Sequence, residues 1–245
     1  MKKIIFSLAI GLMCMTQMYA QTTPEKISYL IVAESRVKSG STFAANQLKM
    51  NASIMKIGKD LVDSRYVHLG ESGRTYTFTN TDNLGAFLDQ SMEIYKKASK
   101  ENPGIAESDS ANYNGPIVRS IWFRMNEMCQ TPKDFDATKY AFRRVTIFTV
   151  PFDKQDIYED AQTKRSALAI KLGVTTPFFV FKARFGYSTN TYMTIEPDES
   201  DIAYYTHRKE RQEQKTNKNA EWQALNKITS PLTTNVRIDQ IYIAK

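Results

Sequence analysis

The sequence predicts an α+β protein whose main part contains the same order of strands and helices twice in succession. Three observations lead to this prediction. Short motifs recur at a nearly constant separation. The alternation of apolar and polar residues indicates the same elements in each half. A short apolar segment stands apart at the N-terminus, before either half begins.

The clearest sign of duplication is a glycine-containing motif. The Gly, Ser, Thr and Tyr of residues 70–76 recur in residues 186–192, at a separation of 116 positions (186 − 70). Further matches join residues 83–87 to 200–204 and residues 118–119 to 236–237, at separations of 117 (200 − 83) and 118 (236 − 118). Loop insertions of single residues would produce this drift, so we predict an internal repeat.

The first half reads as six elements. Ser39 or Ser41 can cap the first helix, because a side-chain oxygen accepts from the free N–H groups of the first turn. Gly70 and Gly73 permit the turn of the hairpin. The predicted elements are a strand at 27–34, a helix at 44–61, hairpin strands at 65–69 and 75–79, a helix at 84–98, a polar loop at 101–115 and a closing strand at 117–125.

The second half repeats this order. Gly173 can end its first helix, and Pro231 lies beyond its second. That second helix has a strongly polar middle over residues 207–219, which we interpret as a solvated face rather than a partner-binding surface. The predicted elements are a strand at 144–150, a helix at 155–172, hairpin strands at 178–185 and 191–195, a long helix at 200–228 and a closing strand at 236–243.

The order strand-helix-strand-strand-helix-strand is the ferredoxin-like arrangement, which leaves one sheet face without helices. Two copies in one chain can cover these faces by packing sheet to sheet as an intrachain pseudo-dimeric α/β barrel. Over residues 27–243 the sequence resembles the dimeric α/β-barrel superfamily, in its element order, its duplication and the Thr-Tyr after the glycine hairpin. Members include antibiotic-biosynthesis-monooxygenase-like, EthD-like and NIPSNAP-like domains and chlorite dismutase relatives. The resemblance implies small-molecule oxidation, haem binding or no known activity.

The N-terminus has the features of a signal peptide. Lys2 and Lys3 precede an apolar run over residues 4–13, and Ala20 offers a small residue at a cleavage site. A retained anchor is the alternative, although the run is short for a bilayer, which takes about 20 apolar residues. We therefore predict an exported protein, in the periplasm, at the outer surface or outside the cell. The predicted segments are a signal peptide at 1–20, a first repeat at 21–126, a linker at 127–139 and a second repeat at 140–245.

Charge and cysteine content exclude some classes of protein. Removing residues 1–20 lowers the net charge from +7 to +5 (7 − 2), and no basic stripe interleaved with aromatic residues appears. We therefore expect no nucleic-acid partner and no transmembrane segment after signal removal. Cys14 leaves with the signal peptide, so Cys129 has no disulfide partner. It lies in the polar linker without a neighbouring histidine, and we interpret it as an incidental thiol.

Strand alternation predicts which side chains face a cleft between the two repeats. Val67 and Leu69 are expected to face the helices, as are Phe179, Phe181, Ala183 and Phe185. A register error of one residue would exchange the two faces. The predicted cleft face carries Tyr66, His68, Tyr76, Trp122, Arg124, Lys182, Arg184 and Tyr192. Such a polar-aromatic set suits an anionic or aromatic ligand, and the alternative is that it fills the interface between the repeats.

The histidines supply no metal site. His68 lies on the predicted cleft face, whereas His207 lies on a polar helix and is expected to be exposed to solvent. A metal site needs further ligands at suitable spacing, and the acidic loop around Asp109 lacks the EF-hand order. We therefore expect no metal and no cofactor.

Two classes of function remain, with a structural subunit that oligomerises through free sheet edges as a third. The first is an exported protein that binds an unknown small molecule or a protein partner. The second is a cofactor-independent monooxygenase-like or haem-binding enzyme of the dimeric α/β-barrel type. Whether the protein is an enzyme is left open, because one fold hosts many functions.

Overall fold

The computed structural model describes residues 28–38, 42–70, 73–132, 135–211, 216 and 218–244. The predicted signal peptide, Cys14 and the capping candidates Ser39 and Ser41 lie outside these residues. Within them, no helix combines the length and the apolar character needed to cross a membrane.

The first repeat contains the predicted elements and one more helix. The additional helix lies in the segment expected to be a polar loop. The elements are β1 (Tyr29–Arg36), α2 (Phe43–Ile57), β2 (Ser64–Gly70), β3 (Arg74–Thr81), α3 (Leu84–Glu101), α4 (Ile105–Asn112) and β4 (Val118–Arg124).

The second repeat has the same strand order. Its long predicted helix is in fact two helices, and the second begins at Asn219, whose side chain accepts a hydrogen bond from the backbone N–H of Trp222 at 2.9 Å. The elements are β5 (Phe142–Thr149), α5 (Gln155–Lys171), β6 (Phe179–Phe185), β7 (Thr191–Asp198), α6 (Asp201–Arg211), α7 (Ala220–Thr229) and β8 (Thr234–Ile243).

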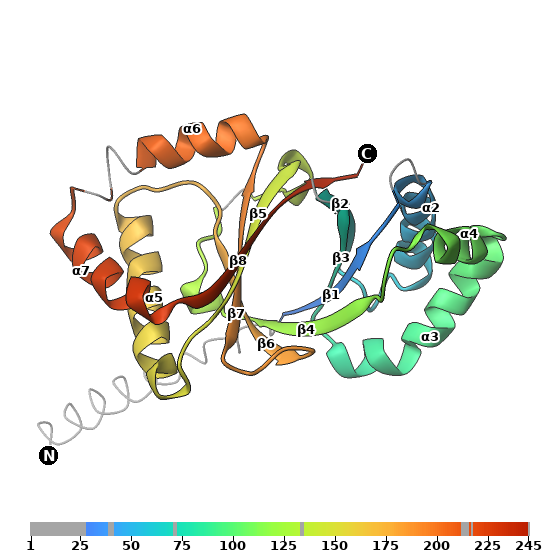
Figure 1. Ribbon diagram of the computed structural model, residues 1–245, viewed down its shortest axis with the longest axis horizontal. Helices are drawn as coiled ribbons and strands as arrows, with labels where there is room; N and C mark the ends of the chain where they lie inside the picture. The colour runs from blue at the N-terminus through green and yellow to red at the C-terminus, as the bar shows by residue number, and fades with distance from the viewer. Residues whose placement is uncertain are drawn as a thin grey trace, which may run out of the picture.

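The eight described strands form one closed barrel in the order β1-β3-β2-β8-β5-β7-β6-β4. Each repeat contributes an antiparallel sheet of four strands, and the two sheets are joined at both edges, where β2 pairs with β8 and β4 pairs with β6. Figure 1 shows the helices of the two repeats on opposite sides of this barrel. Closure pairs every described strand on both sides, so an assembly through free sheet edges has no edge to use.

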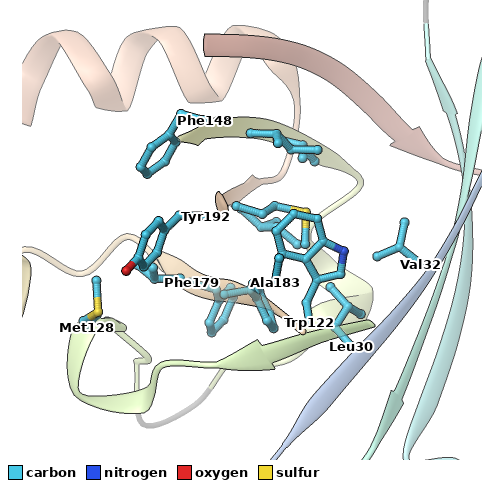
Figure 2. Packing of buried hydrophobic residues seen from close by; sticks show 14 of the residues in the cluster. Leu30, Val32, Trp122, Met128, Phe148, Phe179, Ala183 and Tyr192 are labelled. Atoms are coloured by element: carbon cyan, nitrogen blue, oxygen red, sulfur yellow. The ribbon is translucent and has the colours of Figure 1, made fainter. Parts of the chain in front are cut away.

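The barrel interior is a packed core shared by both repeats. Trp122 of β4 lies between Leu30 and Val32 of β1 and Ala183 of β6 (Figure 2), and all four are at most 4 % exposed. The indole N–H of Trp122 donates to the Ser120 hydroxyl at 2.8 Å, so the ring is buried without an unpaired donor. Because one core joins the two sheets, neither repeat buries its inner face alone.

The outer faces of the two sheets are covered differently. In the first repeat, α2, α3 and α4 form an apolar cluster around Ile54, Ile94 and Ala98. In the second repeat, α5 and α7 contact each other through Ala161, Leu168 and Leu225. The β2 residues that were expected to face the helices are Val67 and Leu69. Both belong to an apolar cluster with Phe43 of α2. The facing prediction for β2 is therefore correct.

The segment between the repeats is structured. A short helical turn over Asn126–Met128 leads to Gln130, which pairs with Phe178. Cys129 is buried, and its sulfur accepts from the backbone N–H of Val180 at 3.2 Å. Cys129, interpreted from the sequence as an incidental thiol, therefore packs against β6 and contacts its backbone.

Candidate functional site

A cavity of about 270 Å³ opens at the end of the barrel where β1, β2, β5 and β6 begin. Both repeats contribute to it. Its apolar wall includes Leu30 and Phe78 from the first repeat and Phe179 and Phe181 from the second. The interrepeat segment adds Phe135, whose ring packs edge-on against Phe179 with the ring centroids 5.0 Å apart. Both repeats and the segment between them therefore supply aromatic side chains to the cavity wall.

Two guanidinium groups enter this aromatic cavity. Arg124, at the end of β4, donates to the Thr131 hydroxyl at 2.8 Å, and its guanidinium carbon lies 4.8 Å from the centre of the Phe179 ring. Its Nε atom is buried and has no hydrogen-bond partner. Arg143, near the start of β5, is 5 % exposed and lies 5.7 Å from the centre of the Tyr66 ring. Both make cation–π contacts with cavity walls.

Neither cavity arginine has an ion-pair partner in the part of the chain that the structure describes. Arg143 instead donates to the backbone carbonyls of Tyr140 at 2.6 Å and Ala137 at 3.4 Å. Burial lowers the pKa of Arg143 to about 10, against the opposing effect of Tyr66. The group is still cationic at neutral pH. The cavity therefore holds two positive charges, and Asp63, the one acid in its wall, is exposed at the rim.

His68 lies behind the wall of the cavity. Its ring is fully buried, with its centroid 4.6 Å from that of Phe78 and 6.3 Å from that of Tyr66. Neither ring nitrogen has a well-aligned hydrogen-bond partner among the described groups. Burial holds the pKa of His68 well below its usual value, the charge of Arg143 lowers it further, and the Tyr76 backbone opposes this only weakly. The ring is neutral and does not reach the cavity.

A charged network also lies on the inward face of the barrel and consists of Glu34, Arg74, Tyr76, Arg237 and Asp239. The Tyr76 hydroxyl donates to Asp239 at 2.6 Å, and Arg237 donates to Glu34 at 2.8 Å. Arg74 lies 3.4 Å from Glu34 and 3.5 Å from Asp239. Burial, then the hydrogen bond to Asp239, raises the pKa of Tyr76. The two arginines and two acids balance, so this network joins β1 and β3 to β8 and leaves no charge for a ligand.

Three of the predicted cleft residues face the opposite way. Lys182 and Tyr192 point out of the barrel, where both bond Glu159 of α5, at 2.7 Å and 2.5 Å. Figure 2 shows Tyr192 with Phe148, on the other side of the sheet from Trp122. Arg184 is exposed outside the barrel, 5.1 Å from the centre of the Phe123 ring. Of the eight predicted residues, Tyr66, His68, Tyr76, Trp122 and Arg124 face inward, and Tyr66 and Arg124 line the cavity.

The error in the second repeat comes from the hairpin. Three residues separate β2 from β3, whereas five separate β6 from β7. Tyr76 pairs with His68, but Tyr192 pairs with Lys182, so a separation of 116 matches residues on opposite faces. Phe179, Phe181 and Ala183 accordingly face the barrel interior instead of the helices, and Phe185, which was also expected to face the helices, is exposed to solvent.

Comparison with known proteins places this geometry among solved structures. The sequence matches no family profile and no curated protein. A candidate monooxygenase from Fusobacterium nucleatum subsp. nucleatum has a TM-score of 0.66 at 12 % identity, over 90 % of this chain and 94 % of that one. An anthrone oxidase-like protein gives 0.58 at 12 % identity, over 91 % and 93 %. A candidate chlorite dismutase gives 0.54 at 7 % identity, over 89 % and 95 %.

The chain has the dimeric α/β-barrel fold. In proteins of this fold two ferredoxin-like units pack sheet to sheet, and here both units belong to one polypeptide. At these low identities the comparison establishes the fold, and the activity has to be argued from the site.

The resemblance to chlorite dismutase relatives implies a haem. The residues of the barrel cavity do not fit one. The cavity wall contains no histidine, cysteine or methionine among the described residues, and Tyr66, whose residue type can also ligate haem iron, lies with its ring against the Arg143 guanidinium. His68 is sealed from the cavity, and His207 bonds Asp198, with Nδ1 3.0 Å from Oδ2. The cavity is also smaller than the roughly 300–1,000 Å³ pockets that enclose drug-sized ligands. We therefore assign no haem step to this site.

Metal binding finds no support in the described residues, among which no group of three or more His, Cys, Asp or Glu side chains could hold an ion. Sequence reasoning missed Arg143, because the strand was predicted to begin at Arg144, whereas β5 begins at Phe142. Arg144 points outward to Glu196 at 2.8 Å. Arg143 therefore points inward, and it pairs with Pro197 of β7 and Ile241 of β8.

Proposed function

We propose that the barrel cavity binds a small aromatic anion of one or two rings that carries a carboxylate or phenolate group. The supporting observation is the pair of guanidinium groups, Arg124 and Arg143, which enter an aromatic cavity without an acid partner among the described residues. A ligand of this class would supply the missing negative charge and stack on the rings.

Burial of a cation without a neighbouring anion costs free energy. An unpaired buried cation loses its hydration, and a matched anion restores much of that energy through charge-assisted hydrogen bonds. Arginine suits this role, since its planar fork matches a carboxylate and its face stacks on aromatic rings. The Tyr66 hydroxyl makes no hydrogen bond with any described group, and it can donate to the same ligand.

The first experiment is an absorption spectrum and a native mass spectrum of the purified chain from residue 21 onward. A co-purifying small acid supports the proposal. Calorimetric titration with benzoate, salicylate and 1-naphthoate, against the neutral benzyl alcohol, then tests the charge requirement. We expect binding of the acids alone.

Variants connect this binding to the cavity. Arg124→Gln is expected to weaken binding about tenfold or more, because a hydrogen bond to a charged group contributes about 1.5–3 kcal/mol. Arg184→Gln is the matched control, since Arg184 also stacks on a phenylalanine ring but lies outside the barrel. Equal affinity of the wild type and the Arg124 variant would contradict the proposal.

A second proposed function is oxidation of such a ligand by O₂ without a cofactor. Its support is the likeness in fold to the anthrone oxidase-like protein and to the candidate monooxygenase. An activated CH₂ group would become a carbonyl with release of one water, so one O₂ is consumed per substrate. The cavity arginines would stabilise the carbanion or enolate that reacts. Oxygen uptake with anthrone-type and phenolic substrates, lost in Arg124→Gln, would favour this function over binding alone.

Export remains part of the proposal. It rests on the N-terminal pattern of Lys2, Lys3 and an apolar run before Ala20. N-terminal sequencing of the protein recovered from a bacterial periplasmic fraction is expected to begin at Gln21. Recovery of the uncleaved chain in membranes would instead support a retained anchor.

A further inference from the structure

A second polar cavity lies outside the barrel, between the sheet of the second repeat and its helices. It has two lobes of about 220 Å³ and about 320 Å³. Strands β5 and β7 form its floor, and helices α5, α6 and α7 form its walls. Six residues line both lobes, namely Gln162, Arg165, Phe178, Glu196, Arg208 and Asn226. The lobes are therefore one continuous space, separate from the barrel cavity.

The charges in this outer cavity do not balance. Three arginines, Arg144, Arg165 and Arg208, face one acid, Glu196. Arg144 lies 2.8 Å from Glu196, whose other oxygen accepts from the Tyr204 hydroxyl at 3.1 Å. Among the described residues no carboxylate lies within ion-pair distance of Arg165 or Arg208. Two positive charges therefore have no paired acid.

Some hydrogen-bond donors in the outer cavity also have no acceptor among the described groups. The Nε atom of Arg165 and the hydroxyl of Thr146 are buried and have no partner. Gln162 is 3 % exposed, and its carbonyl oxygen accepts from Arg165 at 2.9 Å. The amide nitrogen of Gln162 bonds no described group. Buried polar groups are normally satisfied, so a cluster of unmet donors in one space indicates a missing acceptor.

The first repeat shows how a buried arginine is satisfied when no ligand is needed. Arg65 lies at the corresponding level, between the outer sheet face and the helices. It donates to Asn51 at 2.7 Å, to Thr79 at 2.7 Å and to Tyr95 at 3.0 Å. Three acceptors from the protein therefore bond this guanidinium group. Arg165 in the second repeat instead has Gln162 and a long contact of 3.4 Å to Thr229.

An aromatic wall completes the outer cavity. The guanidinium carbon of Arg165 lies 4.9 Å from the centre of the Trp222 ring, which fixes the plane of the guanidinium group. Arg208 lies on α6 and donates a hydrogen bond to the Tyr204 hydroxyl at 3.4 Å. Two guanidinium groups from different helices thus border one space, an arrangement suited to bidentate recognition of an oxyanion.

We propose that the outer cavity of the second repeat is a binding site for a doubly charged oxyanion, a phosphate monoester or a sulfate, held by Arg165, Arg208 and the amide of Gln162. The two unpaired charges match a dianion, and the donors outnumber the acceptors in the wall. Trp222 provides a surface on which an aromatic part of the same ligand can stack. This site does not depend on the function proposed for the barrel cavity.

The test measures the melting temperature and calorimetric affinity of the full chain with inorganic phosphate, sulfate and phenyl phosphate. Sodium chloride at the same ionic strength is the reference. We expect all three anions to raise the melting temperature above that reference, with phenyl phosphate strongest if the ligand is an organic monoester. Stronger effects of the inorganic anions would assign the site to a free oxyanion.

Variants decide whether the outer cavity is responsible. Arg165→Gln and Arg208→Gln are each expected to weaken the binding of inorganic phosphate and sulfate at least tenfold, whereas Arg184→Gln, which lies outside both cavities, binds them as the wild type does. Arg208 is only partly buried, so its variant keeps the fold even if Arg165→Gln does not. Absence of any dianion effect, or unchanged affinity in Arg208→Gln, would overturn the proposal.

Discussion

The buried His68 is expected to reduce the free energy of unfolding as the pH falls. Its buried ring is held neutral, with a pKa well below 6.5 because of burial and the charge of Arg143. Below pH 6.5 the unfolded chain takes up a proton at His68 that the folded chain refuses. This contribution to stability is therefore complete above that pH, and it falls by up to about 1.4 kcal/mol per pH unit as the solution becomes more acidic.

The corresponding prediction is that His68→Phe flattens the acid side of the stability curve. Phenylalanine fills the space beside Phe78 and takes up no proton. Urea unfolding between pH 7.5 and pH 5 is the measurement, and the variant is expected to lose less free energy over this range than the wild type. Phe78→Leu is the control, because it loosens the same core without removing a titrating group. An unchanged acid slope in His68→Phe would show that another residue controls it.

Tyr76 contributes through a hydrogen bond to a charged group. Its hydroxyl donates to Asp239 at 2.6 Å and lies 3.3 Å from Arg237. We predict that Tyr76→Phe lowers the free energy of unfolding by about 1.5–3 kcal/mol, since the partly buried Asp239 loses its shortest hydrogen bond. Tyr158→Phe is the matched control, because the buried Tyr158 hydroxyl bonds no described group. Equal losses in the two variants would mean that the network adds nothing to stability.

At the level of the elements, the hairpin of β6 and β7 depends on Gly186. This residue has φ +84°, and a Cβ there would lie 2.5 Å from the Arg119 carbonyl oxygen of β4. We predict that Gly186→Ala costs more than about 2 kcal/mol, from backbone strain and from the overlap at the β4–β6 seam. Gly104, with φ +81° and open space around it, is the control, and its alanine variant should cost only about 1–2 kcal/mol. Thermal unfolding of both variants is the measurement.

Sequence periodicity predicted the strands well but not their facing in the second repeat. The apolar side of β2 faces the helices, through Val67 and Leu69. In β6 the same rule fails, because a closed barrel covers both faces of every strand. Phe179 and Phe181 fill the barrel, while Lys182 finds Glu159 outside it. Polarity alone cannot distinguish two buried faces, and the longer hairpin turn removed the register that the repeat offered.

Helix boundaries show a similar limit. The polar stretch after His207 is predicted to be the middle of one helix, but the backbone is extended at Asn219, which caps a new helix. Asn219 had the sequence signature of a cap, a short polar side chain before an apolar residue at Trp222. Helix α4 was missed because only Ile105, Ala106 and Ala111 of its eight residues are apolar, and they form no stripe at helical spacing. Arg143 was missed because the predicted strand began one residue after it, at Arg144, whereas β5 begins at Phe142.

On the scale of the whole molecule, closure of the barrel makes the two repeats one folding unit. The core contains Leu30 and Trp122 from the first repeat and Phe181 and Met193 from the second. Separating the repeats would expose this shared core and break the pairing of β2 with β8 and of β4 with β6. The repeated order of elements therefore does not divide the chain into two independently stable units.

The chain's two tryptophans make this cooperativity measurable. Trp122 lies in the shared core, and Trp222 lies in the helical layer of the second repeat. In Trp222→Phe the fluorescence reports the barrel, and in Trp122→Phe it reports the outer helices. We predict that, within each variant, the urea midpoints from fluorescence and from far-UV circular dichroism coincide, as expected for two-state unfolding. If Trp222 instead became exposed at a lower urea concentration than the remaining secondary structure, the α5–α7 layer would be a separate unit. The outer cavity would then open without unfolding the barrel, and dianions would stabilise that early transition alone.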